Sequence, residues 1–405
     1  MIKQDRFIIF PWGMISRTGE RAKKLLEGIK ACGFNGSCFV SENEFDVCRE
    51  LGLKIYCSFA ENGKQERMSD LEIAMMDSTV SDQELYRMMA KRLENLPQDV
   101  HSVYITDEPG AGLFARIKVL TDCVREKAPW AEAYINLFPN YAVCGAPNLS
   151  QLEVETYEEY LERFAAEVSP DLLSLDNYYA IISNNFTDPK GRISYFNNMI
   201  QAIETCQKHH LPFQFIACCN QLRPWQTIPT FANLAFQGYT ALAAGARVLS
   251  WFLYFGRGGY LFAPIDDTTG EDLKTSTWYL LKEVNRRIME LGSLLFNMDF
   301  QGMYFSDTTD LNRAAAICEC TAIKSFSADT ECVVGHYVDH DRKDVILLVN
   351  ADLRYPTKVE LDLGGELECY SVELQKWHKP LLVNGDNAKS PIWLEPGCGI
   401  AFRNK

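Results

Sequence analysis

Short apolar runs alternate with stretches of helical periodicity eight times over roughly the first 295 residues of this 405-residue chain. The first apolar run covers residues 7–10, and the eighth covers residues 248–254. Eight strands that are each followed by a helix are typical of an α/β protein with a (β/α)₈ TIM barrel. An open doubly wound sheet is the alternative. It needs a glycine-rich turn after the first strand, and residues 12–15 read Trp-Gly-Met-Ile, so the barrel is favoured.

The sequence pattern changes near residue 300. Short β-rich runs at 331–337, 344–350, 358–363 and 392–394 are separated by turn residues, and helical periodicity is absent. This pattern predicts a small all-β sandwich. We therefore expect a catalytic barrel over residues 1–299 and a β-sandwich over residues 300–405. Few exposed aromatic side chains are expected in the sandwich, which predicts a structural role for it.

Composition excludes several classes of partner. A net charge of −14 without a Lys/Arg cluster argues against nucleic acid and anionic membranes. No run approaches the ~18 apolar residues of a membrane helix. The 14 cysteines lack zinc-ligand spacing, so we expect them to be buried residues in a reducing compartment, with no metal and no cofactor. Residues 1–5 carry no apolar leader, which predicts a cytoplasmic protein, or a periplasmic or secreted one if a signal peptide was removed. The oligomeric state is left undefined.

Two adjacent acids end the fourth predicted strand. Residues 103–106 are β-rich, Asp107 and Glu108 follow, and Pro109 stops the strand. In a TIM barrel, the carboxyl end of a strand is where catalytic groups lie. The alternative is a solvated turn whose acids lie near the positive end of the next helix dipole.

The other predicted strand ends carry amides, a further acid and aromatic rings. Asp176 follows the apolar run 172–175, and its alternative role is a buried acid that accepts backbone hydrogen bonds. Sugar hydroxyls need many donors and acceptors, and the C–H faces of a sugar stack on aromatic rings. These strand ends therefore predict a carbohydrate substrate. The expected substrate-binding residues are Trp12, Asn136, Phe138, Asn140, Tyr178, Gln221, Trp251 and Tyr254.

Three stretches resemble a known family. Residues 104–110 (YITDEPG), 134–141 (YINLFPNY) and 173–179 (LSLDNYY) resemble glycoside hydrolases common in gut bacteria, which are similar to clan A β-glycosidases. That resemblance implies a TIM barrel with a C-terminal β-sandwich. In clan A, an Asn-Glu-Pro stretch ends the fourth strand and its Glu is the acid/base. The resemblance thus gives Glu108 the general-acid role, with Asp107 in the place of the amide. We expect the neighbouring charge of Asp107 to keep Glu108 protonated.

The seventh strand departs from clan A, which has a glutamate nucleophile there. Residues 215–221 read FIACCNQ, and the nearest candidate is the amide of Gln221. Two alternatives are compatible with hydrolytic activity. In the first, Asp176 is the second carboxylate, and its distance from Glu108 decides between inversion and retention. In the second, Asp107 orients a 2-acetamido group of the substrate, and that group acts as an internal nucleophile. The rival hypothesis is a barrel that binds carbohydrate without hydrolysing it.

Overall fold

The computed structural model describes residues 4–15, 17–59, 69–183, 186, 188–256, 260–380 and 392–405. The chain divides into two compact units. The first unit comprises Met1–Asn177, Glu204–Ile216 and Ser250–Tyr254. The second unit comprises Tyr178–Ile203, Ala217–Leu249 and Phe255–Lys405.

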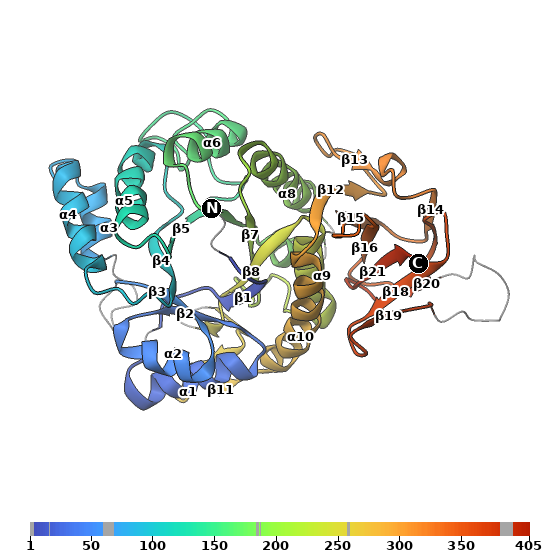
Figure 1. The fold of residues 1–405 in the computed structure, drawn as a ribbon, viewed down its shortest axis with the longest axis horizontal. Helices are drawn as coiled ribbons and strands as arrows, with labels where there is room; N and C mark the ends of the chain where they lie inside the picture. Colours follow the sequence, from blue (N-terminus) through green and yellow to red (C-terminus); the bar gives the residue numbers. More distant parts are fainter. Residues whose placement is uncertain are drawn as a thin grey trace. The chain divides into compact units, whose positions relative to one another are not determined.

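Eight strands form one sheet in the order β1-β8-β7-β6-β5-β4-β3-β2. Figure 1 shows them as a ring with α1 to α6 outside it. The ring closes because Met14, just after β1, forms a parallel bridge with Phe39 of β2. The strands are β1 (Ile8–Pro11), β2 (Gly36–Val40), β3 (Lys54–Cys57), β4 (Val100–Asp107), β5 (Glu132–Leu137), β6 (Leu173–Asp176), β7 (Phe213–Cys218) and β8 (Ala246–Phe252).

The helices follow the strands as the periodicity predicts. They are α1 (Gly19–Ala31), α2 (Phe45–Leu51), α3 (Asp70–Met76), α4 (Asp82–Leu93), α5 (Phe114–Lys127), α6 (Tyr157–Arg163), α7 (Tyr179–Ile182), α8 (Pro189–His209), α9 (Phe231–Ala243) and α10 (Ser276–Phe296). Short turns of helix are η1 (Glu42–Glu44), η2 (Ala111–Leu113), the π-helical η3 (Phe164–Val168) and η4 (Ile317–Glu319). Short strands β9 (Phe255–Gly256), β10 (Ile265–Asp266) and β11 (Leu273–Lys274) precede α10.

Aromatic side chains fill the barrel. Phe10 of β1 stacks on Tyr56 of β3 with ring centroids 4.0 Å apart. Tyr134 of β5 meets Phe10 edge-on, and its ring centroid lies 5.2 Å from that of Phe39. All four rings are fully buried, so the interior is a packed core whose side chains support the strand ends above it.

A capping box fixes the start of α3. Ser69 and Glu72 form a capping box: the Glu72 amide donates to Ser69 Oγ at 3.1 Å, and the Ser69 amide donates to Glu72 Oε2 at 2.9 Å. This box starts α3, a helix that the sequence analysis does not predict. It buries the Glu72 side chain, which matters for the electrostatics of the site below.

Two sheets form the C-terminal part of the second unit. A seven-stranded sheet has the order β13-β12-β15-β16-β21-β18-β19, and a three-stranded sheet has the order β14-β17-β20. The strands are β12 (Asp299–Phe305), β13 (Ala315–Ala316), β14 (Ser325–Ala328), β15 (Cys332–Val338), β16 (Asp344–Asn350), β17 (Thr357–Asp362), β18 (Leu367–Ser371), β19 (Lys376–His378), β20 (Ile392–Leu394) and β21 (Gly399–Asn404).

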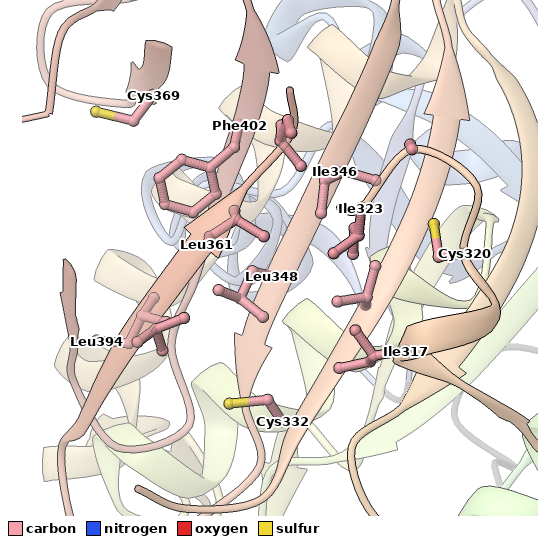
Figure 2. Close-up of a cluster of buried hydrophobic side chains, with 14 residues drawn as sticks. Ile317, Cys320, Ile323, Cys332, Ile346, Leu348, Leu361, Cys369, Leu394 and Phe402 are labelled. Atoms are coloured by element: carbon pink, nitrogen blue, oxygen red, sulfur yellow. The ribbon is translucent and has the colours of Figure 1, made fainter. Parts of the chain in front are cut away.

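A hydrophobic core joins these two sheets. Figure 2 shows Ile346, Leu348 and Phe402 of the larger sheet pointing toward Leu361 and Leu394 of the smaller one. Val334, on the strand beside β16, belongs to the same cluster. Because both sheets contribute side chains to one core, this part of the chain is a β-sandwich, as predicted.

The other face of the larger sheet packs on α9. Every residue of α9 from Asn233 to Ala243 is buried, so this helix is covered all round. Its close approach to β15 needs glycine, since a Cβ on Gly335 would lie 2.7 Å from the Ala243 backbone. The Tyr337 hydroxyl donates a hydrogen bond to the Leu242 carbonyl. The sandwich therefore covers apolar surface of α9.

The predicted fold class is confirmed: a (β/α)₈ barrel with additional β-sheets toward the C-terminus. The predicted division of the chain at residue 299 stays a prediction. All 14 cysteines are free, and all of them except Cys144 and Cys318 are buried, which agrees with their expected role as small core residues.

Candidate active site

The ends of β4, β5 and β6 bring three carboxyl groups together in the first unit. Asn136 of β5 pairs with Asp107 of β4 in the strand register. Its Nδ2 donates to Asp107 Oδ1 at 3.0 Å and to Asp176 Oδ1 at 3.0 Å. Glu108 lies close enough to Asp176 for the Asp176 carboxylate to raise its pKa. We call Asp107, Glu108 and Asp176 the carboxyl cluster.

Glu108 has an unusual backbone conformation. Its φ angle of 45° lies in the left-handed region, which is costly for a residue with a Cβ. The surroundings hold it there. The Glu108 amide donates to the Asn136 carbonyl at 2.8 Å, and the Tyr160 hydroxyl donates to the carbonyl of Pro109 at 2.6 Å. A strained backbone that the packing enforces is common at functional sites.

Burial and like charges raise the pKa of two members of the cluster. The pKa of Asp107 is raised to about 8, first by burial and then by the charge of Glu108, while the Asn136 hydrogen bond opposes both effects. Burial likewise raises the pKa of Glu108 to about 8, with the charge and the hydrogen bond of Asp176 as the next causes. Both acids therefore retain protons near neutrality.

The source of the like charge on Glu108 differs from the prediction. The adjacent Asp107 was expected to raise the pKa of Glu108, but the charge that does so is that of Asp176 on β6, two strands away in the sheet. Neither Asp107 nor Glu108 is a solvated turn residue, because both are at least partly buried.

Carboxyl separation bears on the mechanism. Retaining glycosidases hold their two carboxyls ~5–5.5 Å apart, and inverting ones ~6.5–9.5 Å apart. Glu108 and Asp176 are close enough for the charge of Asp176 to raise the pKa of Glu108. Asp107 Oδ1 and Asp176 Oδ1 share one donor atom, so they cannot lie farther apart than the sum of its two hydrogen-bond distances.

Trp12 belongs to an aromatic group of the first unit. Its ring meets Phe39 edge-on at 5.9 Å and Phe252 at 5.6 Å. Trp12 and Phe252 both remain partly exposed. Phe252 is absent from the expected substrate-binding residues. Its neighbour Trp251 is among them, and Trp251 is fully buried.

The remaining expected residues are distributed over the two units. Tyr254 is fully buried, stacks edge-on against Phe34 and has its hydroxyl near Gly28 of α1, which places it on the helix side of the sheet. Phe138 and Asn140 lie on the loop after β5, where the Tyr157 hydroxyl donates to the Phe138 carbonyl at 2.8 Å. Both side chains are partly exposed.

Tyr178 and Gln221 belong to the second unit. Tyr178 precedes α7. Gln221 is buried, and its Nε2 donates to the Gln226 carbonyl at 2.6 Å and to the Pro224 carbonyl at 3.4 Å. The amide that stands at the end of the seventh strand therefore stabilises its own loop.

Four polar residues around the cluster are missed by the sequence analysis: Glu72, Tyr134, Ser174 and Gln214. Ser174 Oγ donates to Asn136 Oδ1 at 3.0 Å, and Tyr134 OH lies 3.3 Å from Ser174 Oγ. The strand period of two is the signal that finds two of them. Ser174 stands two positions before Asp176, and Tyr134 stands two before Asn136, so each pair shares a face.

The described residues contain neither a metal site nor a membrane-spanning helix. In the described part of the chain, no group of three His, Cys, Asp or Glu residues is arranged to hold a metal ion. No helix within the described ranges combines the length and the apolar character that crossing a membrane requires.

No protein-family model and no curated protein matches the chain. Several solved structures are similar to it. A β-galactosidase from the psychrophilic Marinomonas ef1 is 10% identical with a TM-score of 0.49, over 71% of this chain and 60% of that one. A glycoside hydrolase family 5 protein from Bacteroides vulgatus is 11% identical with a TM-score of 0.49, over 98% of this chain and 88% of that one.

A Bacteroidetes-affiliated family 5 cellulase linked with a polysaccharide utilization locus is 12% identical, with a TM-score of 0.46, over 70% of this chain and 92% of that one. These similar structures are glycoside hydrolases, as the resemblance of the three strand ends predicts. The chain spans about 60% of the length of the Marinomonas β-galactosidase.

Proposed function

We propose that this protein is a glycoside hydrolase in which Glu108 is the general acid. The observation that carries the proposal is the carboxyl cluster at the ends of β4 and β6, with its protons retained near neutrality. Cleavage of a glycosidic bond needs one carboxyl that donates a proton and one that stays ionised. Glu108 meets the first need because its pKa is raised to about 8.

Asp176 is the proposed ionised partner. It is 1% exposed, and the hydrogen bond that it accepts from Asn136 Nδ2 stabilises its carboxylate form against that burial. A protonated Glu108 donates to that carboxylate when no substrate is bound. When a glycosidic oxygen enters, Glu108 turns its proton to that oxygen, and the Asp176 carboxylate faces the oxocarbenium-like centre or the attacking water.

Asp107 has an alternative role as the acid that orients a 2-acetamido group of the substrate. Two variants decide between the roles. If Asp176 is the ionised partner, Asp176→Asn should still bind sugar, and its hydrolysis rate should fall by orders of magnitude on all aryl glycosides. With substrate assistance, Asp107→Asn should have the larger effect, and only 2-acetamido substrates should react. Full activity of both variants would remove both roles.

One observation favours a second candidate function, carbohydrate binding without hydrolysis. The seventh strand offers no carboxylate, and the Gln221 amide is engaged with the Pro224 and Gln226 carbonyls. Titrating oligosaccharides into the wild-type protein separates the two functions. Saturable binding with no release of new reducing ends would support the second candidate and contradict hydrolysis.

A further inference from the structure

A buried chain of hydrogen bonds leads to the carboxyl cluster from below. Gln214 Nε2 donates to the Tyr134 hydroxyl at 2.8 Å. Tyr134 OH lies 3.3 Å from Ser174 Oγ, which donates to Asn136 Oδ1 at 3.0 Å. All four side chains are at most 2% exposed. Water therefore does not compete for these bonds, and each can polarise the next.

The direction of each bond follows from the number of protons available. The Gln214 amide occupies a lone pair of the Tyr134 oxygen, so the single Tyr134 proton is left for Ser174. Ser174 Oγ accepts the hydrogen bond from Tyr134 and donates its own proton to Asn136 Oδ1. The Asn136 amide is thereby fixed with its oxygen toward Ser174. Its nitrogen then faces Asp107 and Asp176, each at 3.0 Å.

We infer that Asn136, held in this orientation by Ser174 and Tyr134, is the positioning residue that sets how many protons the carboxyl cluster carries at neutral pH. Its relevance to catalysis rests on the proposed function. An N–H donor stabilises a carboxylate and not the neutral acid. A flipped Asn136 would instead present its oxygen to Asp107 and Asp176, which would then need protons to avoid repulsion.

Other ionisable groups surround the cluster. Glu72 of α3 adds a charge that opposes ionisation of Asp107. Tyr104 and Tyr160 are close enough to interact with Asp107, and burial raises the pKa of both well above the usual value. Burial raises the pKa of Tyr134 as well. These tyrosines keep their protons across the neutral range, so a titration there reports carboxyl groups.

The test is an infrared pH titration of the protonated carboxyl band in Ser174→Ala, with Ser102→Ala as the matched control. Ser102 is also a fully buried serine, but it lies two positions from the start of β4, and its Oγ donates to the Glu132 carbonyl. Wild type and Ser102→Ala should lose the band with one midpoint. Ser174→Ala should shift that midpoint upward by about one pH unit, as expected for a lost hydrogen bond to a charged group.

Tyr134→Phe provides a second variant, because it removes the same chain one bond earlier and keeps the ring packing. It should shift the midpoint in the same direction by a smaller amount. An unchanged midpoint in both variants would overturn the inference. The titration needs no turnover, so its result is separate from the proposed function. An upward shift in a protein that cleaves no glycoside would retain the role of Asn136 and contradict hydrolysis.

Discussion

Replacing Asp107 by Asn should stabilise the protein at alkaline pH. The folded state holds the Asp107 proton up to a pKa of about 8, against an ordinary value of 3.8. Between those values the folded state binds a proton that the unfolded state has released, so the contribution of Asp107 to the free energy of unfolding falls as pH rises. An Asn side chain has no proton to lose, and its Oδ1 can still accept the Asn136 hydrogen bond.

The size of the effect follows from that difference in pKa. At about 1.4 kcal/mol per pH unit, ionising Asp107 in the folded state costs at most about 6 kcal/mol. Because the side chain keeps some contact with water, we expect about 2 kcal/mol. Unfolding entropy of about 2.1 cal/mol/K per residue over 405 residues converts this to about 2 °C in Tm.

Differential scanning calorimetry at pH 4 and pH 8 measures this effect. The Tm of Asp107→Asn relative to wild type should be about 2 °C higher at pH 8 than it is at pH 4. Asp329→Asn, which removes an exposed carboxyl of the second unit, serves as the matched control. A Tm difference for Asp107→Asn that is equal at both pH values, or that is lower at pH 8, would refute the reasoning.

Two further predictions concern the second unit. Gln221→Glu should lower the free energy of unfolding by about 1–3 kcal/mol and gain no activity, because a carboxylate would face the Pro224 and Gln226 carbonyls that now accept hydrogen bonds from the amide. Urea denaturation measures the stability and a rate assay measures the activity. A variant faster than wild type would contradict this prediction. A chain that ends at residue 298 should be insoluble or unstable, because removing the sandwich exposes the face of α9 that contacts Gly335 and Tyr337. A soluble, fully active fragment would show that the sandwich is dispensable.

The fold was predictable because its signal is repeated along the chain. Each barrel strand is an apolar run and most are followed by a helix with one apolar face, so an error at one boundary leaves the count unchanged. The run predicted at 344–350 has the bounds of β16, whereas the run at 248–254 extends two residues beyond β8. The helix α3 was missed although its Ser69 and Glu72 form a capping box.

The site was less predictable, because a strand end fixes where a residue lies and not where its side chain points. The acids Asp107, Glu108 and Asp176 were found from their places after apolar runs. The sequence reveals neither the left-handed backbone of Glu108 nor its interaction with Asp176 on another strand. Trp251 and Tyr254 were selected as aromatic residues near a strand end, but both are fully buried, and Phe252 contacts Trp12 instead.

The central claim is that Glu108 donates a proton to the departing glycosidic oxygen. The most direct measurement is the rate of wild type and Glu108→Gln on aryl glycosides whose leaving groups differ in acidity. A good leaving group needs no proton, whereas a poor one does. Glu108→Gln should therefore lose about 10²–10⁴-fold in rate on the poorest leaving group and far less on the best one. An equal loss across the series, or no loss at all, would contradict the assignment of Glu108 as the general acid.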